Sequence, residues 1–384
     1  MRQRETLERR SDAGRDHAAS DPRVSWSGVY ALAALQLVVT LGWMTYASFQ
    51  APLVERFGFA ALSGVLSLYL GLAGATLAPI VGGLADRLAA RGASRIPVLV
   101  TGGMLAGATF IGVATSLAAV DPRGPLRWVF LVLVLLWIAA MTILQAPALS
   151  LLPAVASSKR WPLVASPLVV ATVLPTALWP LVRRALDGLG GVAVYAAGGV
   201  LVVAATLLLR GAFETASRAP EAPVRSSEEA ALGSLALVFA VGIVSAFVTR
   251  LASDVVPTIL AMRVAWGDAN PALFSAATLG VGTLLAPTLG GVGASFGSRS
   301  GALGSVVVAV LCGVAAPLAS SLVGAGGIAV ALGAALALHL DCALPFSLES
   351  LPASRAGLSA GLYLGGVFAG SQLAPLVPWL GGST

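Results

Sequence analysis

The sequence predicts an all-α polytopic membrane protein with about eleven spanning helices. Hydrophobic residues make up 57% of the 384-residue chain and charged residues only 10%, and the mean hydropathy is +0.90. A soluble domain carries roughly 25% charged residues, so this chain lacks the polar side chains that would cover a water-soluble globule of its size. The bilayer is therefore the expected solvent for most of the chain.

The apolar residues gather in runs that match the roughly 20 residues a spanning helix needs. The polar, arginine-rich residues 1–25 precede these runs and predict a disordered cytoplasmic tail. A second polar stretch, the predicted cytoplasmic linker 213–230, divides the rest into an N-terminal six-helix bundle (26–212) and a C-terminal bundle (231–384). The eleven predicted spans are 27–50, 61–85, 97–119, 127–152, 161–183, 189–211, 231–256, 271–295, 300–321, 324–348 and 356–380.

The loop arginines predict the orientation. With a cytoplasmic N-terminus, 16 of the 23 Lys and Arg residues fall on the cytoplasmic side and seven on the other, as the positive-inside rule requires. We therefore expect a multi-pass protein of the bacterial cytoplasmic (inner) membrane. The formal charge of +6 then reflects loop arginines and not a nucleic-acid surface, because Lys159 is the single lysine.

Several chemistries lack their residues. The sequence has no Gly-rich loop followed by Lys-Ser/Thr and no metal-ligand spacing. Its two cysteines, Cys312 and Cys342, lie inside apolar runs, and its two histidines, His17 and His339, stand far apart. We expect no enzymatic activity, no cofactor and no metal site.

One charged cluster interrupts the apolar chain at residues 82–95, "GGLADRLAARGASR". Glycines such as Gly82 allow two helices to approach closely. Asp86, at the end of its span, can accept charged hydrogen bonds or face the N-terminus of a neighbouring helix. Arg87, Arg91 and Arg95 can pair with acids or lipid phosphates, or simply hold the loop in the cytoplasm. The cluster is a candidate cytoplasmic latch.

The spacing Gly82-x-x-x-Asp86-Arg87 resembles the cytoplasmic loop motif of the major facilitator superfamily, Gly-x-x-x-Asp-Arg-x-Gly-Arg-Arg. Arg91 matches its last position, whereas alanines replace the second Gly and the first Arg. A degraded copy, "GGVGASFGSRSG", occupies 290–301. The resemblance implies a two-bundle fold with twelve spans, so a twelfth would follow residue 380. It also implies that Asp86 holds the cytoplasmic side closed near the start of span eleven.

The longer stretch "DRLAARGASRIPVLVTGG" resembles the corresponding loop of glycoside–cation symporters and sucrose transporters, with Asp86, Arg87, Arg91, Arg95 and Pro97 in register. The positions 93 and 94 depart from that pattern. The late loop 344–366 looks similar too, but similar loops occur in bacteriochlorophyll-delivery-type proteins. A sugar substrate does not follow from this likeness.

Polar residues inside spans are costly and mark functional candidates. Gln36, Thr40 and Trp43 share one helix face and would recognise a hydroxylated or carbonyl-bearing solute, or would join helices. Further candidates for lining the substrate cavity are Gln145, Tyr363 and Gln372.

Two pairs are candidates for gating or coupling. Arg250 and Asp254, four residues apart, predict an ion pair that forms an extracellular gate or rim; the alternatives are a solvated interfacial pair without a function, or an Arg250 that attracts an anionic substrate. His339 and Asp341 diverge on the helix by about 200°, so they are not expected to line one cavity. Asp341 is the better candidate for binding a proton or cation, and an interhelical hydrogen bond is the alternative for it. His339 can instead be a packed core residue.

The predicted function is a secondary active transporter that moves a small molecule by alternating access, coupled to H⁺ or Na⁺. The alternative is a non-transporting membrane assembly or delivery factor, or an incomplete transporter that needs a partner, which the absent twelfth span favours.

Overall fold

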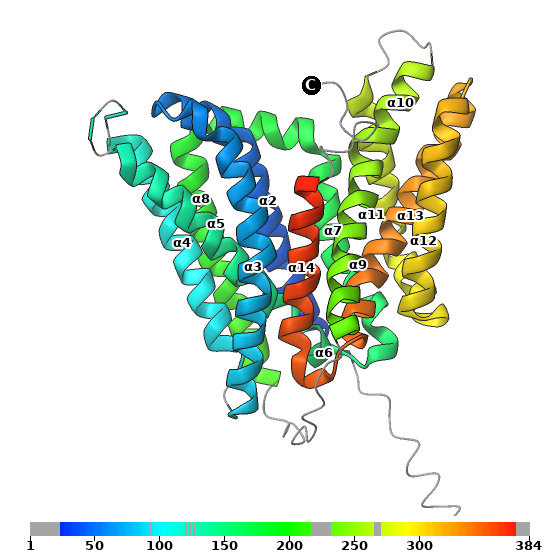
Figure 1. Cartoon of the computed structure of the whole chain (residues 1–384), viewed down its shortest axis with the longest axis horizontal. Helices are drawn as coiled ribbons and strands as arrows, with labels where there is room; N and C mark the ends of the chain where they lie inside the picture. The colour runs from blue at the N-terminus through cyan, green and yellow to red at the C-terminus, as the bar shows by residue number, and fades with distance from the viewer. Residues whose placement is uncertain are drawn as a thin grey trace, which may run out of the picture.

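The computed structural model describes residues 24–92, 94–119, 121–122, 124–125, 127–216, 232–264 and 270–373. Over these ranges the chain is built from helices and contains no strand (Figure 1). The first group comprises α2 (Trp26–Arg56), α3 (Ser63–Ala90), α4 (Ile96–Ala119), α5 (Arg127–Leu149), α6 (Leu152–Val155), α7 (Trp161–Ala177) and α8 (Trp179–Ala216). The second comprises α9 (Leu232–Arg250), α10 (Val256–Arg263), α11 (Pro271–Phe296), α12 (Ser298–Ala315), α13 (Leu322–Glu349) and α14 (Ala356–Leu373).

The long helices suit a bilayer. Within the described ranges, nine helices are long and apolar enough to cross a membrane by length and composition. Large apolar side chains cover their outer surfaces, including Leu284, Leu311 and Val323, which are 80%, 61% and 86% exposed. In hydrocarbon every backbone polar group must be satisfied internally, and a helix does so within one segment. The chain is therefore a multi-pass membrane protein.

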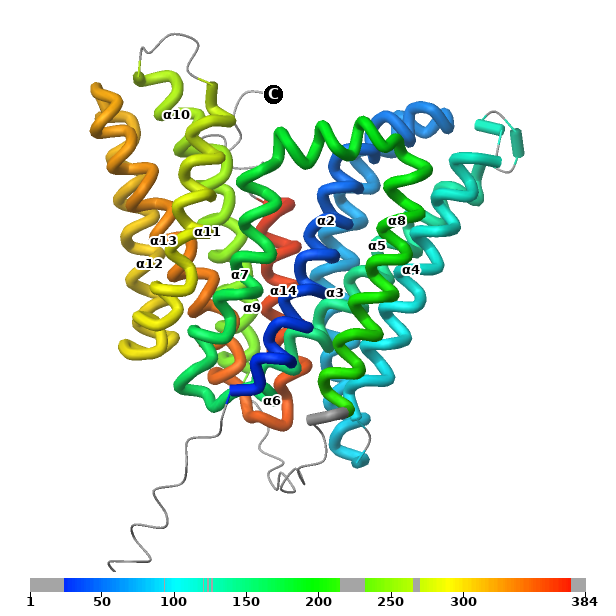
Figure 2. Tube along the Cα trace, turned by 180° about the vertical axis from the view of Figure 1, so that it is seen from behind, coloured from blue at the N-terminus to red at the C-terminus, as the bar shows by residue number. Residues whose placement is uncertain are grey.

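Each of the eleven predicted spans contains a long helix, but several boundaries differ. The fifth was predicted to end at residue 183, whereas α7 ends at Ala177. Residues 179–183, predicted as the end of that span, and 184–188, predicted as the loop before the next span, instead form the first part of α8, which is interrupted at Gly190 with a φ of +75°. Figure 2 shows this first part of α8 lying across the end of the molecule near α10, while the second part runs towards α6. The separation of the two predicted spans at 184–188 thus falls close to the break, but the charged residues Arg183, Arg184 and Asp187 lie in a helix and not in a loop.

Two further boundaries concern the second half. α9 ends at Arg250 and a π-helical turn, Leu251–Val255, separates it from α10, so the predicted span 231–256 is not one regular helix. α14 is described to Leu373, and the rest of the predicted span 356–380 lies outside the described residues. So do residues 1–23 of the predicted tail and 217–231, which include most of the predicted linker.

The helices enclose two hydrophobic cores. The larger lies among α2–α8 and the facing parts of α13 and α14, and includes Phe110 and Trp137. The smaller lies among α9–α13 and includes Val169 and Val173 of α7. Two seams join the halves: the α3–α14 seam, and the α7 seam, where α7 packs on α11 and α13 (Figure 1).

Glycines bring the backbones of the α3–α14 seam into direct contact. A Cβ atom on Gly82 would lie 2.0 Å from the carbonyl oxygen of Gly357, and one on Gly361 would lie 2.3 Å from that of Ala78. Any larger residue there would force the two helices apart. The seam end that holds Gly82 lies near α6 and is called the α6 end below; the opposite end is the α10 end.

This contact predicts that Gly82→Ala destabilises the protein by about 1–3 kcal/mol, the usual cost of overpacking, measured by thermal unfolding in detergent. Gly83→Ala is the matched control, since the nearest atom to its new Cβ would be Leu358 Cδ1 at 3.9 Å. Equal stability of the two variants would contradict the direct helix contact.

Candidate functional site

Asp86 is the most extensively bonded carboxylate among the described residues. Its Oδ1 accepts from the backbone N–H of Gly357 at 2.9 Å and from Arg95 Nη2 at 3.0 Å, and its Oδ2 accepts from the N–H of Leu358 at 2.7 Å. The side chain belongs to α3 and is only 7% exposed. One carboxylate thus joins the two halves at the α6 end.

The partners explain why a carboxylate suits this position. Gly357 and Leu358 lie in the first turn of α14, whose amides have no partner within the helix. The positive end of the helix dipole favours a negative charge there, and charge-assisted bonds are stronger than neutral ones. Of the other predicted latch residues, Arg87 and Arg91 lie exposed at the same end.

The two polar candidates of α2 make contacts within the protein. Gln36 Nε2 donates to Thr172 Oγ1 of α7 at 3.1 Å, and Thr40 Oγ1 donates to the carbonyl oxygen of Gln36 at 2.9 Å. The Gln36 amide thus joins α2 to α7, which is the helix-packing role that the sequence left open.

Trp43 belongs to an aromatic cluster that the sequence did not predict. Its ring centroid lies 5.1 Å from that of Trp137 on α5 and 5.7 Å from that of Phe368 on α14. Tyr46 stacks on Trp137 at 5.3 Å, and Phe110 meets Trp137 edge-on at 5.1 Å. These residues come from four helices, so no local spacing could reveal the cluster. Trp43 and Phe368 connect the two halves.

Several buried polar atoms on α2 and α5 have no hydrogen-bond partner in the part of the chain that the structure describes. Among the described residues, the Tyr46 hydroxyl, the Trp137 indole nitrogen and Gln145 Oε1 form no hydrogen bond. Gln145 is 7% exposed, and so is Tyr363 of α14. The side chain of Gln372 packs against Gly71 in the α3–α14 seam.

His339 and Asp341 have contrasting surroundings on α13. The two ring nitrogens of His339 meet serine hydroxyls on two other helices, Ser245 on α9 at 2.9 Å and Ser305 on α12 at 3.2 Å. Asp341 is 0% exposed, and neither of its carboxyl oxygens has a hydrogen-bond partner among the described residues. His339 thus ties three helices together, whereas Asp341 makes no such bond.

Arg250 and Asp254 form the predicted ion pair, with Arg250 Nη2 2.7 Å from Asp254 Oδ2. Their side chains are 39% and 42% exposed, and the π-helical turn lies between them. An exposed pair of this kind contributes roughly 0–1 kcal/mol. The pair lies at the α10 end of the second half.

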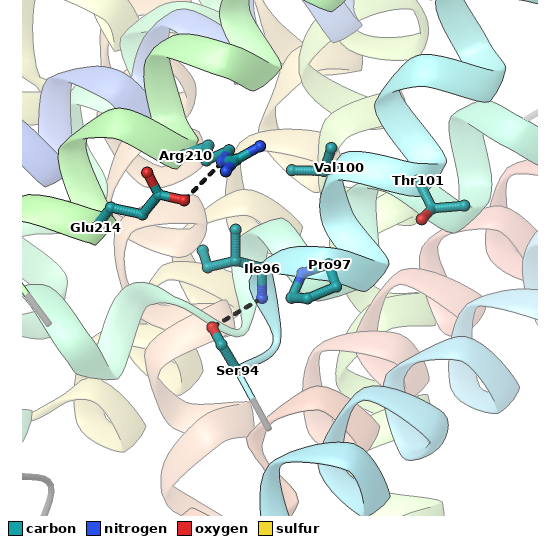
Figure 3. Close-up of a pocket in the computed structure, with 7 residues that line it drawn as sticks. All are labelled: Ser94, Ile96, Pro97, Val100, Thr101, Arg210 and Glu214. Carbon is teal, nitrogen blue, oxygen red and sulfur yellow. Dashed lines mark hydrogen bonds and ion pairs between the residues drawn. The ribbon is translucent and has the colours of Figure 1, made fainter. Parts of the chain in front are cut away.

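A cleft of about 490 Å³ lies at the edge of the first half, between the start of α4 and the end of α8 (Figure 3). Its lining contains the ion pair of Arg210 and Glu214, 2.6 Å apart. None of the predicted substrate-binding residues lines this cleft. No group of three His, Cys, Asp or Glu side chains in the described ranges could hold a metal ion.

No protein-family model and no curated protein sequence matches this chain. Solved structures do match over nearly its whole length. The human organic anion transporter MFSD10 superposes with a TM-score of 0.65 and 16% identity, covering 93% of this chain and 95% of MFSD10. FucP, a major facilitator superfamily transporter in the outward conformation, superposes with a TM-score of 0.62 and 13% identity, covering 91% and 90%. The chain has the major facilitator fold. The resemblance noted from residues 82–95 is thereby confirmed at the level of fold.

The two halves of this major facilitator fold meet at related glycine pairs. Gly82 of the first pair contacts the start of α14, as described above. Gly290 of the second pair contacts the start of α7, where a Cβ atom would lie 2.0 Å from Ser166 Oγ and 2.8 Å from the carbonyl oxygen of Pro162. The sequence echo between 82–95 and 290–301 thus marks two helix contacts, but Ala294 stands in the second copy where the first has its acid.

The bond between Gln36 and Thr172 predicts a coupling energy. In a double-mutant cycle of Gln36→Leu and Thr172→Val, thermal unfolding should give a coupling of about 0.6 kcal/mol and at most about 1.7 kcal/mol, the average and the maximum known for interhelical hydrogen bonds in a membrane protein. Thr176→Val is the control, because the Thr176 hydroxyl donates only within α7, to the carbonyl oxygen of Thr172. The effects of Thr176→Val and Gln36→Leu on stability should therefore add. Additivity in both cycles would show that Gln36 does not join the helices.

Proposed function

We propose that this protein is a secondary active transporter that moves a small solute across a membrane by alternating access. The observation that carries the proposal is the buried contact of the α3–α14 seam at the α6 end, where one carboxylate, Asp86, bonds α3 to the start of α14. Transporters of this kind work by rocking of two bundles around a site near the middle of the membrane. The names of MFSD10 and FucP, which describe both as transporters, support the same function.

The arginine distribution supports a cytoplasmic α6 end. Arg87, Arg91 and Arg95 lie there, and 16 of the 23 Lys and Arg residues fall on that side if the N-terminus is cytoplasmic. In this orientation the structure is closed towards the cytoplasm, and the Arg250–Asp254 pair lies at the outer rim.

The contacts of Asp86 suit repeated opening. Arg95 belongs to the connection between α3 and α4, so it moves with Asp86 when the halves separate. Opening then breaks the two bonds to Gly357 and Leu358, while the ion pair with Arg95 persists. A carboxylate that keeps one cationic partner avoids the several kcal/mol that an unpaired buried charge costs. Asp86 thus acts as a latch that can open and close.

The proposed substrate site lies where both halves contribute aromatic and polar side chains near the midplane. Trp43 and Gln145 represent the first half, and Phe368 and Tyr363 the second. Rings supply apolar contact area and unpartnered polar atoms supply hydrogen bonds, as in typical small-molecule sites.

The latch predicts that Asp86→Asn shifts the protein towards opening at the α6 end. Asparagine lacks the negative charge, and it offers one acceptor oxygen to two backbone amides. Spin labels on Ala90→Cys and Ala353→Cys, both exposed across the α3–α14 seam, in a background with Cys312→Ala and Cys342→Ala, would report a longer distance in the variant. Arg87→Ala and Arg91→Ala are controls that should keep the native distance. An unchanged distance in Asp86→Asn would refute the latch.

Transport itself is tested by solute-dependent thermal stabilisation of the purified protein, screened over sugars, organic acids, amino acids and drugs. A ligand at 100 times its Kd should stabilise the folded state by about 2.7 kcal/mol. Trp43→Ala should abolish the shift and Trp128→Ala, a change at an exposed position, should retain it. A hit should then accumulate in proteoliposomes under an ion gradient; a hit that binds without moving would contradict the transport proposal.

A further inference from the structure

The α7 seam contains a carboxyl group of its own, and it is bonded differently from Asp86. Asp341 lies on α13 and is 0% exposed. Both of its oxygens lack a hydrogen-bond partner among the described residues. Asp86 has three such partners in the other seam. Each contact between the halves therefore holds one buried acid: Asp86 has three well-formed hydrogen bonds, whereas Asp341 has only the Ser166 hydroxyl beside it, outside good hydrogen-bond geometry.

The packing around Asp341 leaves little space. Gly290 of α11 contacts Ser166 and Pro162 of α7, and a Cβ atom on Gly293 would lie 2.6 Å from Cys342 Sγ of α13. Ser166 is the neighbouring hydroxyl, and it donates to the carbonyl oxygen of Pro162 at 3.3 Å. The three helices thus touch through small residues at the level of Asp341.

No cation balances Asp341. The helices α7, α11 and α13 contain no lysine or arginine. None of the titratable or charged groups on α13 and on the elements packed against it forms an ion pair with Asp341 among the described residues, and several of them are bonded to other groups. Glu349 accepts from Ser298 and Arg250 pairs with Asp254. The full set is His339, Cys342 and Glu349 on α13, Lys159 and Arg160 before α7, Arg299 and Cys312 on α12, Arg250 and Asp254 around the end of α9, and Tyr363 on α14.

An ionised carboxylate would be costly in these surroundings. Removing a charge from water costs several kcal/mol even after relaxation, unless a partner compensates it. A neutral carboxylic acid avoids most of this cost. Hard cations such as Ca²⁺ take six or more oxygen ligands, and only one neighbouring hydroxyl is available here. A proton is the ligand that this site fits.

We propose that Asp341 is a proton-binding site that couples protonation to closure of the α7 seam. When α7 separates from α11 and α13, water reaches the carboxyl group and it releases its proton. When the seam closes, the group takes a proton up again. The inference rests on the proposed function, because it requires the seam to open and close.

Proton linkage gives the direction in which pH changes the ratio of closed to open α7 seams. The closed seam binds one proton more than the open seam, so raising the pH favours the open seam. One linked proton changes the ratio of closed to open molecules by at most about tenfold per pH unit.

The test is a distance measurement across the α7 seam. Lys159 and Ser300 are exposed at the α6 end, one before α7 and the other at the start of α12. Spin labels on Lys159→Cys and Ser300→Cys, with Cys312→Ala and Cys342→Ala, would be measured in nanodiscs between pH 5 and pH 9. We expect a short-distance population that decreases, and a long-distance population that increases, as the pH rises.

Asp341→Asn tests whether the Asp341 carboxyl group causes the pH dependence of the distance, because asparagine is close in size to aspartate and does not ionise between pH 5 and pH 9. The variant should keep the short distance at every pH. Asp86→Asn is the matched control, and it should retain the pH dependence since Asp341 is intact. A native pH dependence that persists in Asp341→Asn would overturn the proposal. If the native protein shows both distance populations but their ratio does not change with pH, the role of Asp341 is refuted and alternating access is still supported. A single distance under all conditions, including Asp86→Asn, would count against both.

Discussion

Two backbone amides at the start of α14, both bonded to the carboxylate of Asp86, form the interaction on which the arrangement of the halves depends. The amides would otherwise remain unsatisfied in a buried place. They become available to α3 because Gly82 and Gly357 lack side chains at the contact. Close packing and charge-assisted bonding thus require each other: the glycines bring the helices together, and the carboxylate satisfies the groups that this approach buries.

The same fold shows a related contact with different chemistry at the α7 seam. Gly290 allows the close helix contact there. Pro162, however, lies in the first turn of α7 and has no backbone N–H to donate, and Ala294 stands where the first glycine motif has its acid. The buried acid comes instead from α13, as Asp341. The two contacts between the halves thus differ: charge-assisted bonds of Asp86 hold one, whereas the other buries Asp341, whose oxygens have no hydrogen-bond partner among the described residues. The two seams are therefore expected to respond to different conditions.

The spans could be predicted from sequence because a helix is the form in which a long apolar run satisfies its own backbone in lipid. The division near Gly190 was also close to the predicted one, because Arg183, Arg184 and Asp187 interrupt the apolar run, but those charges did not reveal that the segment before Gly190 is itself helical. Residues 82–95 predicted a charged cluster at a helix end, but not that Arg95 rather than Arg87 or Arg91 would pair with Asp86. The aromatic cluster around Trp137 and the lack of partners at Asp341 depend on several helices at once, so no spacing along the chain encodes them.

The edge-on contact between Trp43 and Phe368 has an optical consequence. An indole emits at a wavelength and intensity that depend on the groups around it, and the neighbours of Trp43 come from both halves of the molecule. Any displacement of α14 relative to α2 changes those neighbours, while Trp137 stays packed among rings of its own half. Trp43, one of eight tryptophans in the chain, is thus a natural fluorophore at the contact between the two halves.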